Sequence, residues 1–307
     1  MTRRSICSRS GVFRAGPARA AVLVLVLVAA GAAAASSPPF IHFHFESEGG
    51  REAALKCGEI WRAEGPRLAA LIPAGVRADT VHCLVLNTGE FSRRFGDRLP
   101  DWGVGVAMGG GLVALDYARM PAVGRGLREV FLHEMTHAIL FQVAGEAWLP
   151  AWFHEGTAMQ LSGEWRFSDT VSLILDGRVP DLARLQGRWP GLETRADRAY
   201  RASLLGVQRL LTRFGPDVIP RILAATREAG DFADGFLAAT GETPAAFTGD
   251  FAAAMRHRYG WITILTRWPG LFVIMALILV FGAVRKIFLT RRRLAAMDDE
   301  DFSPPEI

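Results

Sequence analysis

Apolar and polar residues alternate along several short stretches in the first part of the chain, which is the pattern of half-buried β-strands. Residues 40–46 alternate one by one, and residues 80–86 are rich in Val and Leu. Residues 103–108 and 112–116 predict two further strands, and the three glycines at 109–111 between them favour a hairpin turn. The pattern therefore predicts a small sheet in the N-terminal half.

Most of the remaining chain has apolar residues at the three- and four-residue spacing of amphipathic helices. A helix is expected at 51–72, where Gly65 and Pro66 can divide it in two because proline interrupts the helical hydrogen bonds. Further helices are expected at 90–95, 125–143, 152–161 and 196–213, with a short one starting at 180 and three more up to about residue 258. The sequence thus predicts an α+β fold, with a small mixed N-terminal sheet followed by a helical part.

The predicted helix over 125–143 contains His133-Glu134-x-x-His137 within an apolar run that lacks Pro and Gly. Residues four apart share a helix face, with β-carbons about 5–6 Å apart, so His133 and His137 can bind one metal ion. Glu134 lies beside that face, where a carboxylate can act as the base for a metal-bound water. This arrangement is typical of zinc hydrolases, and the same pentapeptide also occurs by chance.

A second motif follows directly, Trp152-x-x-Glu155-Gly156-x-Ala158. Two His and one Glu form one of the ligand sets of catalytic zinc sites, so Glu155 is the expected third ligand of a Zn²⁺ ion. With these two motifs the sequence resembles the gluzincin metallopeptidases, and among them the peptidase MA-like family. The resemblance spans residues 81–260.

This resemblance implies a zincin-like fold in which the hairpin at 104–116 occupies the position of the strand that binds peptide substrates. It also implies a donor for the tetrahedral oxyanion from the C-terminal half, for which Tyr200 is the candidate and Arg201 the alternative. The chain departs from many gluzincins one turn after Glu155, where Met159 replaces a carboxylate that orients a zinc-binding histidine. Gln160 or a backbone carbonyl is then expected to orient it.

Charge and hydropathy indicate how the chain is placed in a membrane. Residues 1–35 combine five Arg, an apolar stretch and a run of alanines, which predicts a signal peptide, either cleaved or kept as an anchor. A second apolar segment at 262–286 predicts a transmembrane helix, because an Arg cluster at 291–293 follows it. The tail at 287–307 is then cytoplasmic, and residues 36–260 form a periplasmic or extracellular domain with parts at 36–145 and 146–260.

The formal net charge of +4 comes from these flanking segments. Residues 37–261 carry 24 basic and 26 acidic side chains, so the composition does not support nucleic-acid binding. Cys57 and Cys83 are the two cysteines of the exported part, either joined as a disulfide or present as two small buried side chains.

Three further histidines are either structural side chains or candidate ligands. His42 and His44 share one face of a predicted strand, either as an ordinary half-exposed face or as a pair of metal ligands. His154 precedes Glu155 on its predicted helix and points elsewhere, so a structural role is expected.

The leading functional hypothesis is a membrane-anchored zinc metallopeptidase that acts on peptide or protein substrates outside the cytoplasm, with Glu134 as the base and Tyr200 as the oxyanion donor. The alternative is a zinc-stabilised binding or scaffold module of the cell envelope that does not cut. Intact Glu134 favours the enzyme, because a purely structural zinc site has no use for a base.

The charge pattern predicts the topology of the membrane-inserted chain. A reporter fused at Ile307 should be active in the cytoplasm, and one inserted near Ser47 should be active outside it. Paired cytoplasmic and periplasmic reporters at both positions measure this. Cytoplasmic activity at Ser47 alone would reverse the orientation.

Overall fold

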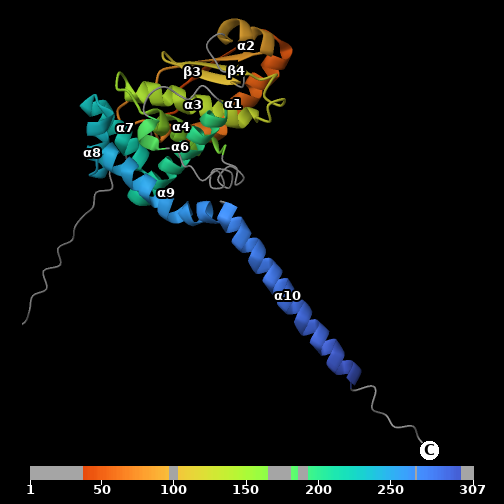
Figure 1. The fold of residues 1–307 in the computed structure, drawn as a ribbon. Coiled ribbons are helices and arrows are strands. Elements are labelled where there is room, and N and C mark those ends of the chain that lie inside the picture. The colour runs from red at the N-terminus through yellow and green to blue at the C-terminus, as the bar shows by residue number, and fades with distance from the viewer. Residues whose placement is uncertain (1–36, 97–102, 165–180, 186–192, 267, 299–307) are drawn as a thin grey trace, which may run out of the picture. The chain divides into compact units, whose positions relative to one another are not determined.

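The computed structural model describes residues 37–96, 103–164, 181–185, 193–266 and 268–298 (Figure 1). The predicted signal peptide at 1–35 lies outside the described residues.

Four strands form a mixed sheet in the order β1-β2-β4-β3, as the alternating pattern predicts. β1 (Ile41–Phe45), β2 (Val81–Leu86) and β4 (Leu112–Asp116) are parallel neighbours. β3 (Gly105–Met108) pairs antiparallel with β4 through the predicted hairpin and lies at the edge of the sheet. The edge strand β3 and its partner β4 are therefore the last two strands before the histidine motif in the chain.

The long helix α1 (Glu48–Ala69) connects β1 to β2 and begins at Ser47, whose hydroxyl accepts a hydrogen bond from the Gly50 amide. The expected division at Gly65 and Pro66 is wrong, because α1 runs through both residues. Pro66 lies in the last turn of the helix, which ends three residues later. The hydrogen bond lost because proline has no N–H therefore weakens only the end of the helix.

Helices cover both faces of the sheet (Figure 1). α2 (Thr88–Phe95) lies on the outer face, where Phe91 and Phe95 pack with Leu86 of β2. α1 and α3 (Leu127–Ala144) cover the inner face, and Phe43 of β1 packs there on Phe131 of α3. α3 is thus the central helix, with twelve buried residues.

Hydrogen bonds hold the C-terminal end of α3 in place. The Gln142 side chain accepts from the Asp79 amide and donates to the Asp79 carbonyl, with N–O distances of 3.1 and 3.3 Å. Arg227 donates to the carbonyls of Gln142 and Val143, which are otherwise unpaired at a helix end. α3 ends at Gly145, whose φ of 64° suits glycine.

α4 (Ala151–Ser162) packs between α3 and α6 (Glu193–Phe214), and a single turn of 3-10 helix, η1 (Leu182–Arg184), precedes α6. Gly156 of α4 faces α6 so closely that a β-carbon there would lie 2.3 Å from the Ser203 carbonyl oxygen. This is the close helix contact for which Gly156 is needed.

Three more helices complete the folded domain, α7 (Val218–Ala229), α8 (Phe232–Thr240) and α9 (Pro244–Thr266). The side chain of Trp152 from α4 is fully buried and packs on Phe232 and Phe247 from α8 and α9. This aromatic cluster anchors α4, which carries the second sequence motif.

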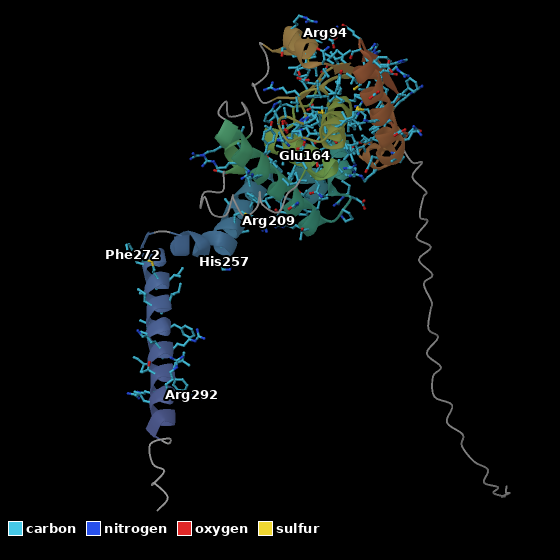
Figure 2. The ribbon with its side chains drawn as sticks, turned by 90° about the vertical axis from the view of Figure 1, so that its right-hand side faces the viewer. Arg94, Glu164, Arg209, His257, Phe272 and Arg292 are labelled. Atoms are coloured by element: carbon cyan, nitrogen blue, oxygen red, sulfur yellow. The ribbon has the colours of Figure 1, made fainter. Side chains whose placement is uncertain are left out.

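The last helix, α10 (Trp268–Asp298), contains a segment long and apolar enough to cross a membrane, Phe272–Leu294. Its apolar side chains are exposed, and Phe272 and Arg292 mark its two ends in Figure 2. The segment overlaps the predicted span at 262–286 and extends past Arg285 and Lys286.

The structure has Cys57 and Cys83 as free, buried thiols, which agrees with the second of the two readings of these residues. Burial raises the pKa of the Cys57 thiol to about 12. Both side chains therefore pack as small apolar groups.

The contact at Gly156 makes a specific prediction about stability. Gly156→Ala places a methyl group against the backbone of α6 and should lower the free energy of unfolding by about 1–3 kcal/mol. Chemical unfolding of the full-length protein in detergent measures the change.

Gly249→Ala is the matched control, because nothing lies within 4 Å of a β-carbon at this helical position. It should leave the protein as stable or stabilise it by about 0.5–1 kcal/mol. Equal stability of the two variants would show that α4 and α6 do not need this close contact.

Candidate metal centre

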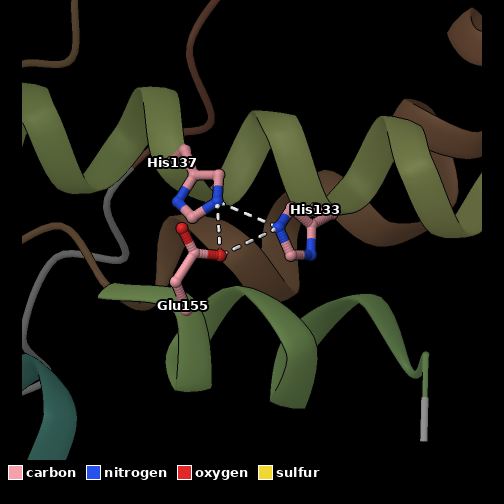
Figure 3. Close-up of side chains that lie close together, drawn as sticks. All are labelled: His133, His137 and Glu155. Atoms are coloured by element: carbon pink, nitrogen blue, oxygen red, sulfur yellow. Dashed lines mark hydrogen bonds and ion pairs between the residues drawn. The ribbon is translucent and has the colours of Figure 1, made fainter. Parts of the chain in front are cut away.

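Helices α3 and α4 bring the three expected ligands together (Figure 3). His133 and His137 lie one turn apart on α3, with their Nε2 atoms 2.9 Å from each other. The Glu155 Oε2 atom from α4 lies 3.4 Å from each of these nitrogens. One donor atom from each residue therefore faces the same point, and the group can hold a metal ion.

The three donor atoms can all be satisfied by one cation, whereas hydrogen bonds among them cannot satisfy all three. The buried Glu155 Oε2 atom has no hydrogen-bond partner among the described residues. The two Nε2 atoms face each other. If both rings are neutral, only one of these two nitrogens can carry a proton that bonds to the other. A metal ion would accept a lone pair from each of the three atoms, which removes the unpaired acceptor.

A second carboxylate supports His133 from its other side. Glu164 Oε2 lies 3.3 Å from His133 Nδ1, and Glu164 Oε1 lies 3.5 Å from Arg125 Nη1. An acceptor this close to Nδ1 favours the tautomer whose Nε2 lone pair faces the metal position. Glu164 is therefore the candidate for the orienting role for which the sequence suggested Gln160 or a backbone carbonyl.

Burial and mutual attraction shift the pKa values of these groups. Burial alone would lower the pKa of His133, but Glu164 and Glu155 outweigh it and hold that pKa well above its usual value. Burial alone would raise the pKa values of Glu155 and Glu164, and attraction to the histidines lowers both instead. The carboxylates therefore stay charged and favour a positive partner between them.

Glu134 belongs to the same buried cluster without being one of the three donors. Burial raises its pKa, although the neighbouring His133 and His137 act in the opposite direction. Its side chain lies against the edge strand β3, since a β-carbon on Gly105 would be 2.6 Å from Glu134 Oε1. Gly105 therefore makes room for this carboxylate.

His154 covers the opposite side of the centre. Its ring stacks on His137 with centroids 4.4 Å apart and an angle of 7° between the planes, and Phe141 packs on it in turn. Burial, followed by the nearby His137, lowers the pKa of His154 to about 3, so its ring is neutral. The expectation that His154 points elsewhere is therefore wrong, because its ring packs on the proposed ligand His137, although His154 is not one of the three donors.

A cavity of about 310 Å³ opens on the remaining side. The edge strand β3, the start of α3 and helix α6 contribute to its walls. It reaches His133 and Glu134, and Tyr200 and Arg201 of α6 also line it, as does Glu164. Burial raises the pKa of Tyr200 well above its usual value, and the carboxylates of Glu155, Glu134 and Glu164 add to this effect, so its hydroxyl keeps the proton.

Two residues of this centre had no signal in the sequence. Glu164 follows the end of α4, and Arg125 precedes the start of α3, although it was the first residue of the helix expected there. The packing of α4 on α3 brings Glu164 to His133, and Arg125 pairs with Glu164.

Comparisons with known proteins add little to this geometry. No family model matches the chain, and no solved structure matches it. The uncharacterized protein YhcO of Bacillus subtilis is 29% identical to the chain over 132 residues, which is 40% of each protein. The matched region therefore covers less than half the length of this relative.

The contact between Glu164 and His133 predicts that Glu164 increases the affinity of the site for a metal ion. Glu164→Gln keeps the shape of the side chain but removes its charge, so the affinity for Zn²⁺ should fall by about 10–100-fold. Competition against a chromogenic chelator measures this on the full-length protein.

Glu129→Gln is the control, because Glu129 lines the same cavity but lies outside the group of three donors. Its affinity for Zn²⁺ should match that of the wild type. Equal affinities in all three proteins would show that Glu164 does not orient a metal ligand.

Proposed function

We propose that this protein is a zinc metallopeptidase, anchored in the membrane by α10, that hydrolyses peptide bonds outside the cytoplasm. The observation that carries the proposal is the position of Glu134. It is a buried carboxylate at the wall of the cavity, next to the His133, His137 and Glu155 group but outside it. A site that only stabilises the fold has no need for such a group.

The donor set and its spacing favour Zn²⁺. Two imidazoles and one carboxylate form a known set for catalytic zinc, with bonds of about 2.0–2.2 Å that separate tetrahedral ligands by about 3.3 Å. The observed separations of 2.9 and 3.4 Å agree with these values. Three protein donors beside an open cavity also match catalytic sites, since structural zinc sites are closed by four.

When bound, the zinc ion would supply Lewis acidity, which lowers the pKa of a water molecule and polarises the scissile carbonyl. Glu134 takes the proton of the attacking water on its carboxylate, holds it, and transfers it to the leaving amine. Burial keeps this carboxylate out of bulk water and raises its pKa, which makes it a better proton acceptor.

Tyr200 donates a hydrogen bond from its hydroxyl group to the oxyanion of the tetrahedral intermediate. It lines the same cavity as Glu134, and its raised pKa keeps the proton on the oxygen. Arg201 lines this cavity too and is the alternative donor.

The edge strand β3 suits an extended peptide as the substrate. Among the described strands, β3 has a neighbour on one side only, and Gly103, Val104 and Gly105 line the cavity. A peptide that adds to this edge as a further strand would pair through main-chain hydrogen bonds. Its scissile bond would then pass beside Glu134.

Membrane anchoring follows from α10, whose exposed apolar segment ends beside Arg291, Arg292 and Arg293. Positive residues remain on the cytoplasmic side, so the folded domain before α10 would lie outside the cytoplasm. The expected substrates are therefore peptides or proteins of the envelope or the exterior.

Glu134→Gln tests the mechanism. The amide has nearly the same shape and leaves all three proposed ligands unchanged, so zinc content and melting temperature should stay at wild-type values. Hydrolysis of a quenched fluorescent peptide library should fall by about 10²–10⁴-fold, because the proton acceptor is lost.

Glu59→Gln is the control for the charge change, because Glu59 is exposed on α1. It should cut peptides at the wild-type rate. A Glu134→Gln protein that cuts like the wild type would overturn the mechanism, and a wild type that binds zinc but cuts nothing would favour the non-catalytic module.

A further inference from the structure

The outer face of the sheet carries a second cluster of imidazoles. His42 and His44 alternate on β1 with Ile41 and Phe43, which face the core. The parallel register places His82 of β2 opposite His42. All three histidines are exposed, and because Phe43 packs on α3, they lie on the face of the sheet that points away from the metal centre.

The His82 ring lies beside each of the other two rings. His44 Nε2 lies 3.0 Å from His82 Nδ1, and the two rings stack with centroids 5.3 Å apart. The His42 ring stacks on the His82 ring at 5.5 Å with an angle of 14° between the planes. His82 therefore lies between the other two, within reach of both.

This cluster is unusual for the chain. The sequence has seven histidines, of which six fall into two groups, His133, His137 and His154 at the metal centre and His42, His44 and His82 here. The seventh, His257, lies on α9. Many kinds of side chain are tolerated at exposed strand positions. Three adjacent imidazoles at such positions therefore point to ligand binding.

We propose that His44 and His82, with His42 as a third donor, bind a divalent transition-metal ion of the Ni²⁺, Cu²⁺ and Zn²⁺ class. Two nitrogens bound to one such ion are separated by about 2.9–3.3 Å, and the observed pair at 3.0 Å has this separation. Without an ion the two nitrogens are hydrogen-bonded to each other, so both exposed rings would turn to direct their lone pairs at one ion. His42 is exposed and adjacent, so a rotation of its side chain brings a third nitrogen to the ion.

The donor chemistry selects this class of ion. Imidazole nitrogens suit Zn²⁺, Cu²⁺ and Ni²⁺, whereas Mg²⁺ and Ca²⁺ need oxygen donors. The strand geometry supports the site as well, since both strands are paired in the sheet and hold the three β-carbons at fixed spacing.

Metal stoichiometry tests the proposal on the full-length protein in detergent. Equilibrium dialysis against Ni²⁺ should load wild type with about one equivalent more than the His44→Gln/His82→Gln variant. His257→Gln should load like the wild type, because it removes an exposed histidine outside both groups. Since the cluster is exposed, melting temperatures should agree among all three proteins.

Glu155→Ala separates this site from the metal centre. It should lose the equivalent bound between α3 and α4 and keep the equivalent bound at the cluster, whether or not the protein is a peptidase. His42→Gln should weaken Ni²⁺ binding at the cluster, and unchanged binding would remove His42 from the site.

Equal Ni²⁺ loading of wild type and the double variant would overturn the proposal. A second measurement does not depend on that variant. Cu²⁺ bound to the His133→Gln/His137→Gln protein, whose metal centre keeps neither of its two imidazole donors, should show nitrogen hyperfine coupling in its electron paramagnetic resonance spectrum. A bound Cu²⁺ signal without nitrogen coupling would also overturn the proposal.

Discussion

Three carboxylates surround two imidazoles where α4 crosses α3, and this concentration of charge is the constraint that shapes the folded domain. The side chains of His133, His137 and Glu164 are between 9 and 11% exposed, and that of Glu155 is 20% exposed. Each unpaired ion in such a place costs several kcal/mol. Arg125 offsets part of the negative charge, and a divalent cation between the donors would offset most of the rest.

These groups stay together only if α3 and α4 keep fixed positions relative to each other. α3 is held at its C-terminal end by Gln142 and by Arg227, and its motif face is covered by the edge strand β3. α4 is fixed from the opposite side, where Gly156 lets it approach α6 closely. Gly105 and Gly156 thus have related roles, because each leaves space that a β-carbon would fill, Gly105 for the Glu134 carboxylate and Gly156 for the backbone of α6.

Local periodicity accounts for what the sequence could predict. The histidine pair follows from the helix repeat, and Glu155 follows from a second motif on a helix whose apolar residues are evident. The strands follow from alternation, and their bounds agree closely with those expected. The short helices up to α9 were expected for the same reason, although α9 extends to Thr266.

The residues that could not be predicted are those that depend on contacts between distant segments. Glu164 lies past the end of α4 in irregular chain, and only the crossing of α4 over α3 brings it to His133. His82 joins His42 and His44 only through the parallel register of β1 and β2. The break expected at Pro66 failed for a different reason, since proline is tolerated near a helix end that is about to stop.

The two sides of the candidate metal centre differ, and this difference decides how a substrate could reach it. On one side His154 lies flat on His137, and Phe141 lies on His154, so these rings close the approach past the second histidine. On the other side the cavity reaches His133 and Glu134 and extends to Tyr200. A coordination position left open by the three donors could face this cavity, whose lining includes Glu134, Tyr200 and Gly105 of the edge strand β3. The proposed base and the proposed oxyanion donor thus line the same cavity, from which a peptide could approach both, as hydrolysis requires.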